Sequence, residues 1–299
     1  MTDNSRHSSP VQHGFPHLET VREAVNALFR RLSDDGIRAY GTPFAPADAA
    51  FGDADDLYLG AHRVASAMVR ALRLPDARIV VGFRAMRDAA SVELAAGPEY
   101  FVEVNDRFRT HRRDLAAALA HEVTHVLLHR LGLRFPTTAG DEILTDTAAA
   151  YLGAGWLLLD AYREDDLTHQ KLGYLTPEEF GFVLAKRERF IGGEDLSAWF
   201  TSPQAYEAYV RGRAMARRDL RRAPLAAAGR AERWRYARDR RAAPAPPGRG
   251  AAYRFEVHAD GPRVSFPCPV CEQRLRLPAD RGPLRARCGL CHTVLDCDT

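Results

Sequence analysis

The sequence predicts an α+β protein, with a mostly helical domain that carries a small antiparallel sheet, followed by a small C-terminal β domain. Three observations lead to this prediction. Apolar residues recur at helical spacing through most of the chain, and three short runs between residues 79 and 104 have the composition of strands. The five cysteines all lie after residue 267, and in a reducing compartment such a cluster indicates a metal site rather than disulfide bonds.

Length and composition narrow the possible functions. The 299 residues can hold one sizeable domain and one small one, and a hydrophobic content of 46% supports a buried core. No apolar run reaches the length of a membrane span, and the polar residues 1–16 lack the apolar stretch of a secretory signal. We therefore expect a cytoplasmic protein with no membrane partner. The net charge of +3 is uneven, because residues 222–299 hold 15 Arg against 8 Asp and Glu, which gives +7.

The elements of the first half follow from periodicity. Apolar residues at helical spacing predict helices over 18–32 and 57–71. Three strands are then expected at 79–83, 91–94 and 100–104, and the last two are joined as a hairpin through Ala-Gly-Pro.

The second half continues with helices. We expect helices at 115–131, at 142–162 after Asp141 as N-cap, at 175–189 and at 204–222. These elements suggest four parts of the chain: a disordered tail at 1–16, the main domain at 17–222, an Ala-, Arg-, Pro- and Gly-rich linker at 223–252, and the small β domain at 253–299.

The chemistry is concentrated in the helix at 115–131. It contains the motif His121-Glu-Val-Thr-His125, which places two imidazoles one above the other on the same helix face. Two histidines so spaced can bind one zinc ion, and Glu122 beside the first can act as the general base. Glu122 is the only charged residue between residues 115 and 129, so a catalytic role explains a carboxylate in an otherwise uncharged helix.

A catalytic zinc site needs a third protein ligand. His129 continues the same row, but it lies about 12 Å along the helix axis from His121, too far for one ion. Glu142 and Asp146 share one face of the next helix and can both point at the site. Either carboxylate can bind zinc, so the spacing alone leaves both arrangements open.

These residues resemble the gluzincin zinc metallopeptidases, in which His-Glu-x-x-His is followed by Glu-x-x-x-Asp on the next helix. The resemblance covers residues 115–162. It implies that His121, His125 and Glu142 bind the catalytic zinc and that Asp146 orients one of the histidines. It also implies that the zinc polarises a water and a substrate carbonyl, while Glu122 takes the proton from the water and passes it to the leaving amine.

Two further features fit such an enzyme. His169 and Tyr174 follow the motif helices in the chain and are candidates to stabilise the oxyanion. The strand at 100–104 is our candidate for an edge strand that pairs with an extended substrate through main-chain hydrogen bonds.

The cysteines predict a second metal site. Cys268, Cys271, Cys288 and Cys291 form two C-x2-C pairs separated by sixteen residues, the spacing of a four-thiolate structural zinc. The segment resembles a zinc ribbon, and we expect the alternating runs at 273–277 and 284–287 to form a hairpin with a cysteine knuckle at each end. Cys297 is not expected to be a ligand. A domain this small needs the metal in order to fold.

The sequence supports two functions of different classes. The first is a peptidase with one catalytic and one structural zinc that acts on a protein or peptide; zinc-dependent hydrolysis of another amide remains open as a variant. The alternative is a regulatory protein whose ribbon binds nucleic acid or protein, with the larger domain as a scaffold. The ribbon's arginines could contact nucleic acid, but charged outward faces of a hairpin are usually just solvated, and docking to a protein is equally open. The aromatic platform of the ribbon is limited to Tyr253 and Phe255.

Overall fold

The structure is a computed structural model that describes residues 11–50, 52, 54–95, 97–165, 169–193, 195–243 and 252–299, with His169 described by its backbone alone. The helices are α1 (Leu18–Arg38), α2 (Pro46–Ala49), α3 (Leu57–Ala71), α4 (Leu115–Leu131), α5 (Thr138–Leu152), α6 (Trp156–Asp160), α7 (Pro177–Ile191), α8 (Pro203–Leu220) and α9 (Arg230–Ala242). The strands are β1 (Arg78–Arg84), β2 (Ala90–Glu93), β3 (Glu99–Asn105), β4 (Arg163–Glu164), β5 (His169–Gln170), β6 (Arg254–His258), β7 (Gly261–Pro267), β8 (Arg274–Pro278), β9 (Pro283–Arg287) and β10 (Val294–Asp298). The α+β class is confirmed.

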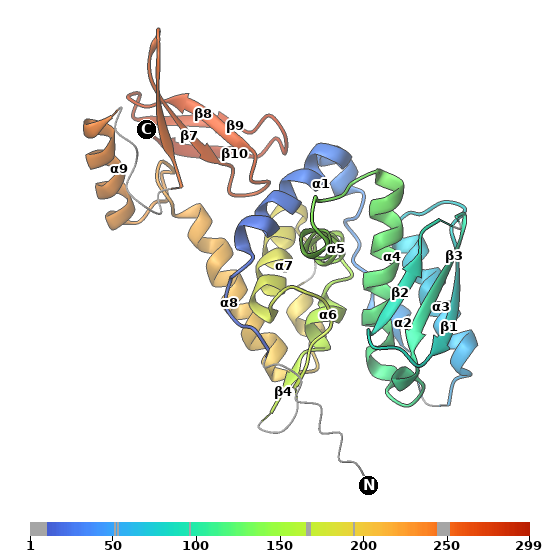
Figure 1. Cartoon of the computed structure of the whole chain (residues 1–299). Coiled ribbons are helices and arrows are strands. Elements are labelled where there is room, and N and C mark those ends of the chain that lie inside the picture. Colours follow the sequence, from blue (N-terminus) through green and yellow to red (C-terminus); the bar gives the residue numbers. More distant parts are fainter. Residues whose placement is uncertain are drawn as a thin grey trace.

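Helix α4 lies at the centre of the larger domain. The sheet and α3 lie on one side of it, and α1, α5, α6 and α7 lie on the other (Figure 1). From Leu115 to Leu128 every side chain is buried except His121 and His125, which are partly exposed. The helix ends at Gly132, whose φ of 62° is left-handed, as predicted. Because α4 is packed on both sides, the backbone that carries the two histidines is fixed in position.

The sheet of the larger domain is mixed. Its strand order is β1-β3-β2, with β1 parallel to β3 and β2 antiparallel to β3. The predicted hairpin of β2 and β3 is confirmed, but the prediction of 100–104 as the edge strand is wrong. Strand β3 is central because both neighbours pair with it, and its residues Tyr100, Val102 and Val104 are buried. Strand β2 forms the edge beside α4.

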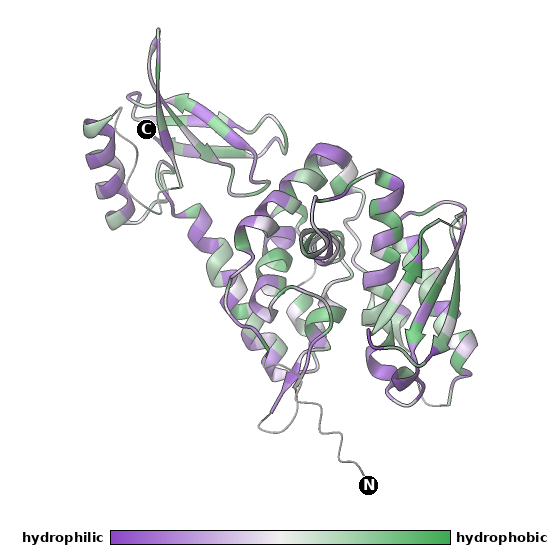
Figure 2. Cartoon of the chain, viewed as in Figure 1, coloured by the Kyte–Doolittle hydropathy of each residue, from purple (hydrophilic) through white to green (hydrophobic). Residues whose placement is uncertain are grey.

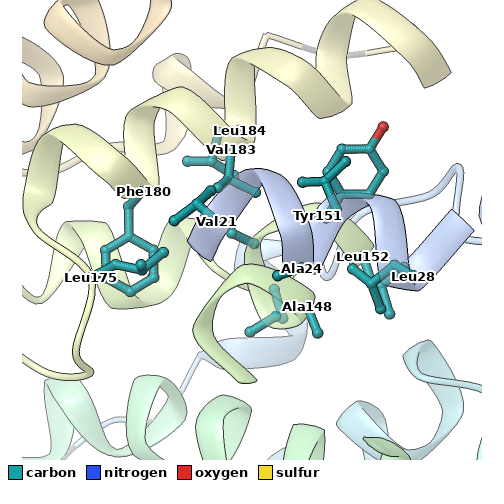
Figure 3. Close-up of a cluster of buried hydrophobic side chains, with 14 of the residues drawn as sticks. Val21, Ala24, Leu28, Ala148, Tyr151, Leu152, Leu175, Phe180, Val183 and Leu184 are labelled. Atoms are coloured by element: carbon teal, nitrogen blue, oxygen red, sulfur yellow. The ribbon is translucent and has the colours of Figure 1, made fainter. Parts of the chain in front are cut away.

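The core of the helical layer joins α1, α5 and α7. Figure 3 shows its side chains, which are at most 3% exposed: Val21, Ala24, Leu28, Ala148, Tyr151, Leu152, Leu175, Phe180, Val183 and Leu184. A capping box is present at the start of α7, because the Thr176 hydroxyl accepts from Glu179 N while the Glu179 carboxylate accepts from Thr176 N. This core fixes α5 against α7.

The helix predicted at 142–162 differs from the structure at both ends. Thr137, and not Asp141, caps α5 by accepting a hydrogen bond from Gly140 N. The helix stops at Gly153, whose φ of 108° is left-handed, and α6 follows as a separate turn. A Cβ at Gly155 would lie 2.3 Å from Ala150 Cα, so the chain doubles back against α5 at this point.

The predicted disordered tail is wrong for the residues that the structure describes from position 11 onward. Gly14 N donates to Glu178 Oε2 at 3.1 Å, and the Thr176 hydroxyl donates to Gly14 O at 2.7 Å. These bonds bind the segment to the start of α7. Residues 1–10 lie outside the described residues.

The C-terminal part contains two small sheets, β6-β7-β8 and β9-β10. The predicted hairpin of 273–277 with 284–287 is therefore wrong, because β8 pairs with β7 and β9 pairs with β10. Helix α9 occupies 230–242, inside the segment expected to be a linker, and the Pro-rich 244–251 lies outside the described residues. The proposed domain boundaries remain predictions. Among the described residues, no helix combines the length and apolarity needed to cross a membrane.

Candidate metal centres

The first centre brings together His121 and His125 from α4 and Glu142 from α5. The two Nε2 atoms are 3.1 Å apart, and Glu142 Oε2 lies 3.0 Å from His121 Nε2 and 3.4 Å from His125 Nε2. Two imidazoles and one carboxylate whose ligand atoms lie within 4.8 Å of one another could hold a metal ion. His129 is exposed in the last turn of α4 and does not belong to this group.

Each ring is oriented through its other nitrogen. His121 Nδ1 lies 2.8 Å from Asp146 Oδ1, and His125 Nδ1 lies 3.2 Å from Thr145 Oγ1. The Thr145 hydroxyl donates to Asp141 O at 2.9 Å, so it accepts from His125 Nδ1–H. Both Nε2 atoms are thereby left as acceptors that face the same point, which is the arrangement a metal requires. Thr145 was not predicted from the sequence, although its i+3 spacing from Glu142 places it on the same helix face.

Asp146 is itself fixed by the loop before α7. It is fully buried, and its Oδ2 accepts from Tyr174 N at 2.5 Å and from Leu175 N at 3.0 Å. Gly173 makes this approach possible, because a Cβ at that position would lie 2.6 Å from Asp146 Oδ2 and its φ of +82° is left-handed. No sequence signal marked Gly173 for this role.

The charges at the centre are strongly coupled. Burial works to raise the pKa of Glu142, but its hydrogen bonds with His121 and His125 outweigh burial and lower the pKa to about 2. Burial likewise opposes the charged form of His121, yet its bonds to Asp146 and Glu142 raise the pKa of that imidazole well above its usual value. Positive charge is thus favoured at this point, which is where a divalent cation would sit.

Glu122 differs from the other carboxylates. It is 6% exposed, and burial raises its pKa. Within the described part of the chain no hydrogen bond or salt bridge holds it. It borders a cleft of about 690 Å³ together with His121 and His125. A desolvated carboxylate with a raised pKa beside the ligands is suited to carry a proton.

The cleft is lined by segments from two parts of the larger domain. Strand β2 and the residues before it form one wall, and residues 134–138 and 171–174 form the other. Tyr174, one of the two oxyanion candidates, is 51% exposed and borders the cleft. The side chain of His169, the other candidate, lies outside the described residues. The edge strand and the tyrosine therefore face the same space as Glu122.

The second centre is the four-cysteine cluster of Cys268, Cys271, Cys288 and Cys291, which are all fully buried. Their sulfurs lie within 4.8 Å of one another and could hold a metal ion. Two equivalent turns present them. In the first turn, Cys268 N donates to Gln273 O, and Cys268 O accepts from Glu272 N. The second turn repeats this pattern with Cys288, Thr293 and His292. Cys297 lies outside the cluster, in β10.

Tyr151 of α5 lies near this cluster. Its hydroxyl is buried and has no hydrogen-bond partner among the described residues. Burial and the neighbouring Cys271 and Cys291 raise the pKa of Tyr151 well above its usual value. None of the four sulfurs accepts a hydrogen bond from this hydroxyl, so it stays an unpartnered polar group near the cluster. The fit to a metal rests on the donor set, because four buried sulfurs that converge in this way match a four-thiolate zinc.

The cluster is seated on the helical domain through a buried ion network. Lys186 of α7 is 2% exposed, and its Nζ lies 2.7 Å from Asp219 Oδ2 and 2.5 Å from Glu272 Oε1 in the first cysteine turn. It also donates to Pro269 O at 2.6 Å. Arg22 of α1 pairs with Asp219 at 2.6 Å. Charges from three helices and one turn therefore join the two parts of the chain.

Comparison with known proteins gives no further assignment. The chain matches no family model, and neither a curated protein nor a solved structure is significantly similar to it.

Proposed function

We propose that the protein is a zinc-dependent peptidase that hydrolyses peptide bonds in the cleft beside α4. The observation that carries this proposal is Glu122, a buried carboxylate with a raised pKa that borders the cleft next to three converging ligand groups. A structural role would require a hydrogen bond or salt bridge to this carboxylate, and among the described residues His121 and His125 act on it only through their charge.

The residues of the chain divide the work. His121, His125 and Glu142 would hold zinc, which when bound supplies a Lewis acid that acidifies water and polarises a carbonyl. Glu122 takes the proton of the attacking water and delivers it to the leaving amine, so one group serves as base and then as acid. Asp146 and Thr145 keep both rings in the tautomer that leaves Nε2 free.

Substrate recognition follows from the walls of the cleft. Strand β2 has a paired neighbour on one side, β3, and its residues Ala90 to Val92 border the cleft. An extended peptide can add to such an edge through main-chain hydrogen bonds, which brings a scissile carbonyl alongside Glu122. Strand β2 therefore takes the role expected for 100–104. The Tyr174 hydroxyl is the donor we assign to the developing oxyanion.

The substitution Glu122→Gln tests the proposal. It preserves shape and removes the base, so cleavage of denatured casein and of a fluorogenic peptide library should fall by at least about 100-fold. Metal analysis should still find two zinc ions per chain. The exposed Glu23→Gln on α1 serves as the control and should retain full activity. Wild-type protein that cleaves neither substrate, or a Glu122→Gln variant of undiminished activity, would contradict the proposal.

A further inference from the structure

Helix α9 presents a basic face with an aromatic residue at its centre. We define the α9 face as Arg230, Trp234, Arg238 and Arg241, which follow the i, i+4, i+8, i+11 spacing of one side of a helix. Trp234 is 67% exposed and the three arginines are exposed as well. Arg238 Cζ lies 5.3 Å from the centre of the Trp234 ring, so the guanidinium is held beside the indole.

The opposite side of α9 fixes this orientation. Tyr236 is 5% exposed and packs against the rings of Tyr253 and Phe255, with ring centres 5.1 Å and 5.4 Å away. Arg240 donates to Ala279 O at 3.2 Å, and Arg233 pairs with Asp298. The helix is thereby attached to the C-terminal sheets with its Trp234 side turned to solvent.

The same packing removes the aromatic platform expected on the ribbon. Tyr253 is 4% exposed and its hydroxyl donates to Asp239 Oδ2 at 3.0 Å, so its ring is part of the small core beneath α9. Phe255 packs against the same ring. Tyr253 therefore presents no free face to a partner and Phe255 is only partly exposed, whereas Trp234 is 67% exposed.

The positive charge of helix α9 indicates an anionic partner. Helix α9 contains six arginines against one glutamate and one aspartate, a net charge of +4 within 13 residues, and Figure 2 shows it as largely hydrophilic. The aspartate, Asp239, is already engaged by Arg238 at 2.7 Å and by Tyr253. An indole between guanidinium groups combines a stacking surface with phosphate-binding groups.

We propose that the α9 face binds single-stranded nucleic acid, with phosphates on the arginines and a base stacked on Trp234. An unpaired base offers a free face for stacking, which the bases of a duplex do not. The arginines contribute an affinity that depends on salt and not on base sequence. This activity lies beyond the peptidase function and does not depend on it.

The experiment uses the full-length, zinc-loaded protein and labelled oligonucleotides of about 12 nucleotides, single-stranded and duplex, measured by anisotropy. Wild type should bind the single strand more tightly than the duplex. Trp234→Ala should weaken single-strand binding by about 10-fold, and Trp234→Phe should retain most of it because a ring remains. Arg238→Glu with Arg241→Glu should lower the slope of log K against log salt by about 1.4, or 0.7 for each lost phosphate contact.

Matched controls exclude effects on folding. Tyr206→Ala on α8 removes a ring that is 48% exposed, and Arg31→Glu reverses an exposed charge on α1; both should bind as wild type. Circular dichroism and zinc content confirm that the variants fold. The proposal is overturned if wild type does not bind, if it prefers duplex, if poly-glutamate competes as well as the oligonucleotide, or if the α9 variants bind like the controls.

Discussion

The two metal centres differ in the access they allow. The ligands of the first, His121, His125 and Glu142, have side chains 12%, 17% and 20% exposed and face a cleft, while the cysteines of the second are fully buried. Three ligands with an open side are typical of catalytic zinc, and four thiolates in a closed shell are typical of structural zinc. This difference supports the proposal that the first centre carries out the reaction and that the second stabilises the fold.

The two centres also differ in what holds their ligands. At the open centre, Asp146 and Thr145 fix the ring nitrogens that face away from the cleft. At the closed centre, backbone turns place the sulfurs, and Lys186 attaches the first turn to the helices. Loss of the first metal should therefore stop the chemistry with the fold intact, whereas loss of the second should affect the fold.

The largest effect expected is from Cys268→Ser. A structural zinc contributes about 10–16 kcal/mol to the folding of a small domain, so the C-terminal sheets should lose their structure and zinc content should fall from two to one. His121→Ala should also lose one zinc, yet keep its C-terminal sheets and unfold at a higher temperature than Cys268→Ser. Zinc analysis and calorimetry separate the two variants. Cys297→Ser is the control and should bind two; a Cys268→Ser protein that retains both ions would contradict the assignment.

Next in size is Lys186→Met, which removes the charge that joins the two parts. The carboxylates of Asp219 and Glu272 would stay buried with one cationic partner fewer, and such a loss costs about 3–5 kcal/mol. Denaturant unfolding monitored by circular dichroism measures it. Arg84→Met breaks an exposed pair with Glu103 and should cost at most about 1 kcal/mol. Equal costs for the two variants would show that the buried network does not hold the ribbon.

A smaller effect is expected at the open centre from Gly173→Ala. The new Cβ would press on Asp146, which would loosen the orientation of His121 and weaken zinc binding by about 10–100-fold. Competition with a zinc-binding dye measures this affinity. Gly192→Ala is the control, because Gly192 has a similar positive φ but open space where a Cβ would lie. This variant should show the same backbone strain and leave zinc affinity unchanged. An equal loss of zinc affinity in both variants would show that the contact with Asp146 is not the cause.

Local sequence signals predicted the parts of each centre that depend on local spacing. The bounds of α4, the helix face that Glu142 and Asp146 share, and the two C-x2-C pairs all follow from residues a few positions apart. Position 173 could not be found in this way, because its need for glycine arises from Asp146, which lies 27 residues earlier in the chain and meets it only in the folded structure.

Long-range pairing explains the remaining errors. The central position of β3 depends on β1 returning to it in parallel, and no short window contains both strands. Strand β8 likewise pairs with β7 and strand β9 with β10, instead of with each other as predicted. Helix α9 was missed for a different reason: proline and glycine after residue 243 dominated the composition of a window whose first part, Arg230–Ala242, contains neither.

The smallest effect is expected from Tyr151→Phe, near the closed centre. The buried Tyr151 hydroxyl has no hydrogen-bond partner among the described residues, so its removal should raise the free energy of unfolding by about 1 kcal/mol. Denaturant unfolding of the zinc-loaded protein measures this change, and a loss of stability in Tyr151→Phe would contradict an unpartnered hydroxyl. Tyr40→Phe, whose hydroxyl donates to Leu72 O, supplies the value for an ordinary buried hydrogen bond.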